Sequence, residues 1–106
     1  MENNHTVVED LLRRLPEVPG DAVLSQTLIK DEKMDITLFS FAAGQELTEH
    51  TSPYRAIVEV LKGEGTMTLG KDFTAIKAGS WIYMPPDLPH SLKTTTPLVM
   101  LLTLVK

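Results

Sequence analysis

The sequence predicts a single all-β domain folded as a barrel, and three observations support this prediction. Short apolar segments with the composition of strands follow one another along most of the chain, and turn residues separate them. Only one segment, close to the N-terminus, has the apolar spacing of a helix. The 106 residues are enough for one domain with one core, and no linker, repeat or low-complexity segment divides them. Many short strands with almost no helix are typical of sandwiches and barrels.

The N-terminal segment, residues 1–17, is predicted to contain one short helix. Thr6 and Glu9 have the spacing of a capping box, in which the two side chains satisfy the free backbone N–H groups of a helix start. Apolar residues then recur at helical spacing at Val8, Leu11, Leu12 and Leu15. Pro16 is expected to end the helix. Its apolar side is expected to lie against the barrel.

Beyond residue 20 the apolar pattern changes to that of strands. Residues 22–30 and 34–42 are predicted to form two strands joined by a polar turn, residues 31–33. In the second strand one face carries Ile36, Leu38 and Ser40, and the other carries Asp35, Thr37, Phe39 and Phe41. Further strands are predicted at residues 55–62, 65–69, 73–77, 81–84, 90–95 and 98–105.

Two stretches, residues 44–65 and 79–90, share one order of features. Each begins at a glycine and delivers a histidine from a loop: His50 from a polar turn, and His90 from a loop stiffened by prolines. The first stretch closes on Gly63, in a tight reversal that requires backbone angles reserved for glycine. Two loops that each deliver one imidazole predict a single shared pocket.

These two stretches resemble the motifs of the cupin family, and the chain is most similar to small single-domain, RmlC-like cupins. The matching positions are Gly44, His50 and residues 60–63 for the first motif, and Gly79, Pro85 and His90 for the second. The resemblance covers residues 34–105 as the conserved barrel. It implies a double-stranded β-helix, or jelly roll, as one domain over residues 1–106, and a homodimer.

The chain departs from the family motifs at three positions. Ser52 stands where the family has its second His, Arg55 where it has its Glu, and Asp87 where the second motif has its Gly. The resemblance implies three His and one Glu around a transition metal. Of that set the chain keeps only His50 and His90.

The altered ligand set disfavours a metal. Two imidazoles can ligate Zn, Fe, Ni, Mn or Cu, but two alone rarely hold a metal tightly. A third ligand would have to come from water or from Ser52, Glu46, Glu49 or Glu59. If Arg55 points inward, as its motif position implies, its charge about 5 Å from a divalent ion costs roughly 6 kcal/mol at an effective dielectric of 20. We therefore expect the divalent metal to be absent or weakly bound.

The same residues favour a small anionic or polar ligand. Arg55 can bind a carboxylate or phosphate through two hydrogen bonds, and His50 and His90 can donate or shuttle a proton. The candidate walls of the pocket are Tyr54, Tyr83 and Trp81. Glu59 lies on the same strand face as Arg55, so it is a candidate lining residue or an internal partner of the arginine.

Three functions remain open at this point, and whether the chain is an enzyme is open with them. The first is a barrel that binds a small molecule without chemistry. The second is a metal-dependent cupin enzyme, a dioxygenase or isomerase that uses His50 and His90. The third is a metal-free isomerase or epimerase with one of these histidines as its base.

Composition excludes several other classes. A net charge of −4 leaves no basic stripe for nucleic acid. The absence of cysteine excludes disulfides and thiolate sites and fits a reducing cytoplasm. The acidic start does not have the pattern of a signal peptide, and the apolar run at residues 98–105 is too short to span a membrane. Strands apolar on both faces, residues 56–61 and 98–102, predict a symmetric dimer.

Overall fold

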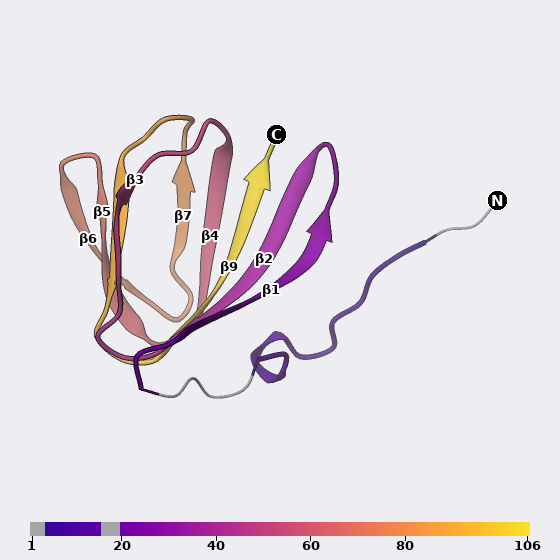
Figure 1. The fold of residues 1–106 in the computed structure, drawn as a ribbon, viewed down its shortest axis with the longest axis horizontal. Coiled ribbons are helices and arrows are strands. Elements are labelled where there is room, and N and C mark those ends of the chain that lie inside the picture. Colours follow the sequence, from indigo (N-terminus) through magenta and orange to yellow (C-terminus); the bar gives the residue numbers. More distant parts are fainter. Residues whose placement is uncertain (1–3, 16–19) are drawn as a thin grey trace.

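Two antiparallel sheets face each other in the computed structural model, which describes residues 4–15 and 20–106 (Figure 1). The first sheet has the order β1-β2-β9-β4-β7, and the second has the order β3-β8-β5-β6. The strands are β1 (Val23–Lys30), β2 (Met34–Phe41), β3 (Glu46–His50), β4 (Arg55–Lys62), β5 (Glu64–Leu69), β6 (Asp72–Lys77), β7 (Trp81–Met84), β8 (His90–Thr94) and β9 (Leu98–Val105). The predicted all-β jelly-roll class is confirmed.

All strands predicted from the sequence are present, with ends shifted by a residue at most, but β3 was missed. The sequence placed His50 in a polar turn, whereas the structure places it at the end of β3. The reason is that only Leu47 of this strand is partly buried and its other residues are exposed. A strand without alternating apolar residues carries no period-two signal.

The predicted N-terminal helix is reduced to a single 3-10 turn, η1 (Leu11–Arg13). Its N-cap is Asp10, whose side chain accepts a hydrogen bond from the Leu12 N–H, so the predicted capping box at Thr6 is wrong. A helix this short has little intrinsic stability, and no residue of the turn is buried. Pro16, the predicted helix end, lies outside the described residues. The segment runs outside the two sheets (Figure 1).

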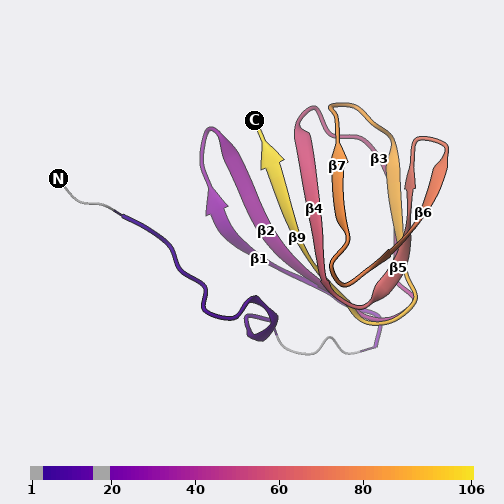
Figure 2. The ribbon, with the colours of Figure 1, turned by 180° about the vertical axis from the view of Figure 1, so that it is seen from behind.

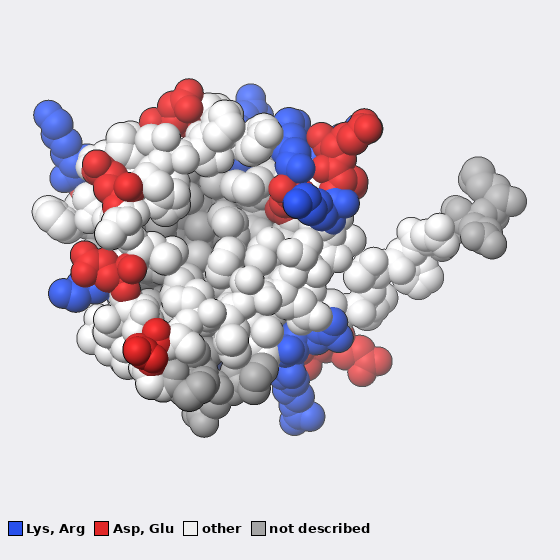
Figure 3. Space-filling view, in the orientation of Figure 1, with Lys and Arg blue, Asp and Glu red and all other residues white. Residues whose placement is uncertain are grey.

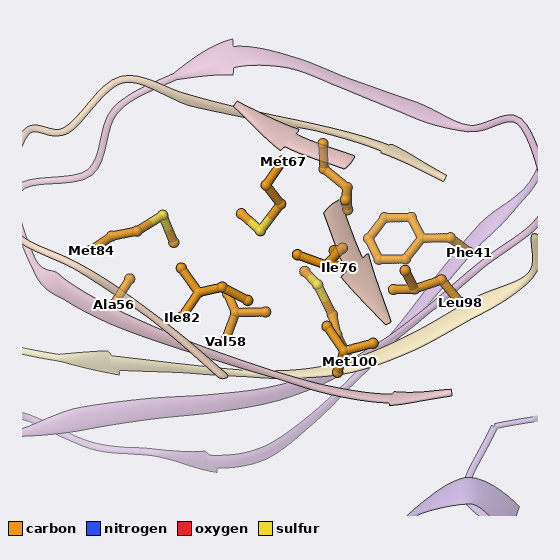
Figure 4. Close-up of a cluster of buried hydrophobic side chains, with 11 residues drawn as sticks. Phe41, Ala56, Val58, Met67, Ile76, Ile82, Met84, Leu98 and Met100 are labelled. Atoms are coloured by element: carbon orange, nitrogen blue, oxygen red, sulfur yellow. The ribbon is translucent and has the colours of Figure 1, made fainter. Parts of the chain in front are cut away.

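The space between the sheets is filled by apolar side chains from both (Figure 4). Strand β4 contributes Ala56, Val58 and Val60, which alternate with residues that point out of the barrel. Met67 of β5 and Leu92 of β8 close the core from the opposite sheet. The predicted alternation of β2 also holds for its aromatic face, where the rings of Phe39 and Phe41 stack with centroids 5.9 Å apart.

Asp31 stabilises the turn that connects β1 and β2. Its carboxylate accepts hydrogen bonds from the backbone N–H groups of Lys33 and Met34, and these bonds lower the pKa of the Asp31 carboxyl group. The end of the chain lies against the same turn, because the Lys106 ammonium group lies 3.0 Å from the Asp35 carboxylate.

Charged side chains gather at the rim of the face in Figure 3, and uncharged residues fill its centre. Within the described residues, no helix has the length and apolar character needed to cross a membrane.

Candidate functional site

The two predicted histidines meet at one end of the barrel. His50 ends β3, His90 begins β8, and the two residues are direct partners in the antiparallel pairing of these strands. Their ring centroids are 4.1 Å apart and the ring planes are inclined by 59°. The prediction that the two stretches build one shared site therefore agrees with the structure.

A β-bulge in β3 brings His50 to this position. Leu47 pairs with Leu92 and His50 pairs with His90. Between these two pairs the chain advances three residues along β3 but only two along β8, so β3 holds one extra residue. In a regular strand, residues three apart point to opposite faces, but the extra residue of a bulge turns the later side chain back. Leu47 and His50 consequently both line the same cavity.

Backbone carbonyl groups determine which nitrogen of each ring is available. Nδ1 of His50 lies 2.8 Å from the carbonyl oxygen of Thr48, and Nδ1 of His90 lies 2.9 Å from that of Leu88. A carbonyl oxygen only accepts hydrogen bonds, so both Nδ1 atoms must carry the proton and donate it. In each neutral ring Nε2 then has a lone pair free to accept a hydrogen bond or to ligate a metal.

The cavity beneath the two rings is small and apolar. Its volume is about 110 Å³. It is lined by Phe39, Leu47, His50, Val58, Met67, Met84, His90, Ser91, Leu92, Met100 and Leu102. The sequence analysis did not identify Met67, Met84 and Met100 as lining residues of this cavity. Side chains alternate between the two faces of a strand, and the inward-facing positions of these residues were the signal that could have identified them.

Arg55 and Glu59 lie outside this cavity, which corrects the expectation that Arg55 points inward. Both are exposed, and they alternate along β4 with the buried Ala56, Val58 and Val60. The inward-facing residue beside Arg55 is Ala56, whose methyl group can neither ligate a metal nor bind an anion. Because the guanidinium lies on the outer face, the predicted arginine grip on an anion in the barrel has no support.

The predicted aromatic walls are not in the cavity either. Trp81 and Tyr83 lie on the outer face of β7, directly beside Glu59 and Ile57 of β4. Tyr54 lies in the loop after β3 and is 38% exposed. None of the three lines the cavity under the two histidines.

The two loops beside the histidines support each other. The β3–β4 and β7–β8 loops lie side by side in both views (Figures 1 and 2), and the Asp87 N–H donates a hydrogen bond to the Ser52 carbonyl at 2.8 Å. Asp87 has a φ of 65°, the left-handed conformation that glycine adopts without strain. The turn that the family motif builds with Gly is thus built here with Asp.

We expect Asp87→Gly to stabilise the protein. Relief of the left-handed strain is partly offset by the greater backbone freedom of glycine in the unfolded chain, so the expected gain is about 0.5 kcal/mol. Urea denaturation of the purified variant measures this change. Asp87→Ala is the matched control, and it should be no more stable than the parent because it keeps a Cβ atom at the same φ. A gain from alanine equal to that from glycine would contradict the explanation by strain.

The residues at the site do not form a complete metal-ligand set. Among the described residues, no three His, Cys, Asp or Glu side chains come close enough together to hold a metal ion. Ser52 is used by its own loop, where its hydroxyl oxygen accepts a hydrogen bond from the Tyr54 N–H. His50 and His90 could supply two ligands through Nε2, which is short of the three or four that resident metals usually have. A tightly held resident metal does not fit this site.

Comparisons with known proteins agree with this architecture. The family model described as "Cupin domain" matches residues 37–104. A conserved Streptococcus pyogenes protein of unknown function is similar over 98% of this chain and 90% of its own, with 35% identity and a TM-score of 0.87. A cupin superfamily protein from Desulfitobacterium hafniense shares 23% identity over 98% of this chain and 95% of its own, with a TM-score of 0.85.

A cupin 2 conserved barrel domain protein from Leptotrichia buccalis is 31% identical over 87% of this chain and 44% of its own, with a TM-score of 0.80. No curated protein gives a significant match.

Proposed function

Since this chain belongs to the cupin domain family, we propose that it is a barrel that binds a small molecule between His50 and His90. The ligand has an apolar body, which enters the cavity, and a polar head that donates hydrogen bonds to the two Nε2 atoms. Its class includes small alcohols and phenols. An anionic head would require at least one of the two rings to be protonated, because Arg55 lies outside the cavity.

One observation carries this proposal. Both Nδ1 atoms donate to backbone carbonyls, so the two histidines that line this largely apolar cavity each keep a free Nε2 lone pair. Binding pockets in proteins commonly combine apolar walls with a few well-placed polar groups. A cavity of about 150 Å³ with apolar walls binds benzene, so the volume here suits part of one ring or a short aliphatic chain.

Phenol and its methyl ether, anisole, test the proposal because a methyl group in anisole replaces the hydrogen-bond donor of phenol. We expect phenol to bind about fivefold more tightly than anisole, since one net hydrogen bond contributes about 1 kcal/mol. Titrations followed by ¹H–¹⁵N NMR measure both dissociation constants. Equal affinities for phenol and anisole in the parent protein would refute the proposed role of the imidazoles.

Variants test whether the imidazole rings of His50 and His90 cause the preference for phenol over anisole. In the double variant His50→Leu, His90→Leu, the preference for phenol over anisole should be lost, because no Nε2 acceptor remains at the cavity. His5→Leu changes the third histidine of the chain, which does not line the cavity, and should keep the preference. A preference that persists in the double variant contradicts the proposal.

The same arrangement favours a second candidate, metal-free acid–base catalysis by His50 or His90. A neutral imidazole whose Nδ1–H is held by a carbonyl group presents Nε2 as a base in a fixed orientation. In an isomerase or epimerase of this kind, the variant that removes the catalytic base, His50→Ala or His90→Ala, should abolish turnover and spare ligand binding. If both variants retain turnover, neither imidazole is the base.

Metal analysis separates both candidates from a metal-dependent enzyme. Elemental analysis of protein purified without chelator should find less than stoichiometric Zn, Fe, Ni, Mn or Cu, since only two protein ligands are present at the site. One metal ion per chain that is lost in the double His→Leu variant would overturn the proposal and support the metal-dependent enzyme.

A further inference from the structure

Three of the five methionines of the chain line the cavity beneath the two histidines. Met67 lies on β5 of the second sheet, and Met84 and Met100 lie on β7 and β9 of the first. All three are buried. Their side chains enter the space between the sheets from both sides (Figure 4). The cavity therefore has thioether groups on both of its walls.

Aromatic rings are the second feature of this lining. Phe39 pairs with Met100 across β2 and β9, and both residues line the cavity. The imidazole rings of His50 and His90 line it as well. Six of the eleven lining residues thus carry a sulfur atom or an aromatic ring, so the walls differ from those of a purely aliphatic cavity.

These groups discriminate between ligands of similar size. A methionine sulfur makes a favourable contact with an aromatic ring at about 5 Å, often at the ring edge. Two aromatic rings in offset or edge-to-face packing also attract each other beyond the gain from the area that they bury. A saturated ring has no π-system, so in the same cavity it gains only from burial.

Methionine also allows the cavity to adapt to a ring. The cavity volume is about 110 Å³, which is smaller than the roughly 150 Å³ of an apolar cavity that binds benzene. An unbranched methionine side chain has three rotatable bonds and fills irregular spaces. A rotamer change at Met67, Met84 or Met100 can therefore supply the additional space.

We propose that the apolar body of the ligand is an aromatic ring, held between the thioethers of Met67, Met84 and Met100. This inference rests on the proposed function, since it places the ligand in the same cavity with its donor toward His50 and His90. It narrows the ligand class from small alcohols and phenols to small aromatic compounds that carry a hydrogen-bond donor. Saturated alcohols of the same size are expected to bind more weakly.

Benzyl alcohol and cyclohexylmethanol test the inference, because they share one hydroxymethyl donor and differ only in the ring. We expect benzyl alcohol to bind about tenfold more tightly, since several sulfur–aromatic contacts add to the burial that both rings share. NMR of protein labelled with ¹³C at the methionine methyl groups measures both dissociation constants. Bound benzyl alcohol should shift the methyl signals of the three cavity methionines through its ring current. The signal of Met34, which does not line the cavity, should stay in place.

Leucine variants test whether the thioethers cause this preference. A change from methionine to leucine nearly conserves volume and apolar character, so the variants should remain folded. In the triple variant Met67→Leu, Met84→Leu, Met100→Leu the preference should fall to about twofold, the contribution that Phe39 can make alone. Each single variant should lower it in part, which keeps the test valid if the triple variant does not fold. Met34→Leu is the matched control and should keep the full preference.

Three results would overturn the inference. One is equal affinity of the parent protein for the two alcohols, and another is the absence of binding by both. The third is a preference that the leucine variants leave undiminished, which would assign it to cavity shape. Failure of the proposed function is measured separately by phenol and anisole. A tenfold ring preference together with equal phenol and anisole affinities would retain the aromatic body and remove the role of the imidazoles, and the reverse result would retain the imidazoles alone.

Discussion

Replacing Gly63 by Ala is expected to lower the free energy of unfolding by at least about 3 kcal/mol, the largest effect expected for a single methyl group in this chain. Gly63 has a φ of 92°, which costs an L-residue about 1–2 kcal/mol. An added Cβ would also overlap the carbonyl oxygen of Pro97 and lie 2.8 Å from Cα of Leu98. Both contacts are with backbone, so relief requires movement of the connection between β8 and β9.

Thermal unfolding measures this effect, with Gly79→Ala as the matched control. Gly79 has a φ of 94°, close to that of Gly63, but no atom lies within 4 Å of an added Cβ. The control therefore carries the backbone strain without the overlap and should cost about 1–2 kcal/mol. For a domain of this size, 3 kcal/mol corresponds to a fall in Tm of about 12–24 °C. Equal losses in the two variants would show that the contact with Pro97 contributes nothing.

Replacing Thr94 by Val is expected to cost about 2–4 kcal/mol, although the two side chains have nearly the same shape. Thr94 is 1% exposed. Its hydroxyl donates a hydrogen bond to the Ala42 carbonyl at 2.8 Å and accepts one from the Gln45 N–H at 2.8 Å. Valine leaves both backbone groups without these partners, and each unpaired group costs about 1–3 kcal/mol when it is shielded from water.

Thr94→Ser is the control, because serine keeps the hydroxyl and loses only a methyl group, which costs about 1 kcal/mol. Urea denaturation compares the two variants, and a valine variant as stable as the serine variant would disprove the role of the hydroxyl. The same hydrogen bonds hold the connection from β2 to β3, the strand that carries His50. We therefore also expect Thr94→Val to weaken phenol binding more than Thr94→Ser does.

Most of the barrel could be predicted from the sequence because its strands alternate between buried and exposed residues. In β4 and β7 every second residue is buried, and turn residues mark both ends, so the predicted bounds were correct. Strand β3 lacked that alternation and was missed. The N-terminal helix was overpredicted because a capping-box pattern at Thr6 cannot stabilise so short a segment without tertiary contacts.

The candidate site was predicted only in part. The paired loops correctly indicated that His50 and His90 meet. Arg55 was assigned to the interior from its place in the motif. The alternation along its own strand was the better guide. Arg55, Ile57 and Glu59 lie on one face of β4, and the buried Ala56, Val58 and Val60 lie on the other. Strand alternation is a stronger constraint than motif position, because a shift of one residue moves a side chain to the opposite face.

The sequence by itself determined the class of the fold, the strands with their turns, and the presence of two imidazoles on paired loops. These follow from local patterns, since side-chain periodicity and turn chemistry act over a few residues. The tertiary structure alone decided that a bulge turns His50 toward the cavity, and that carbonyl groups hold both Nδ1 protons. Those features depend on how β3 pairs with β8, two strands that are about 40 residues apart in the chain.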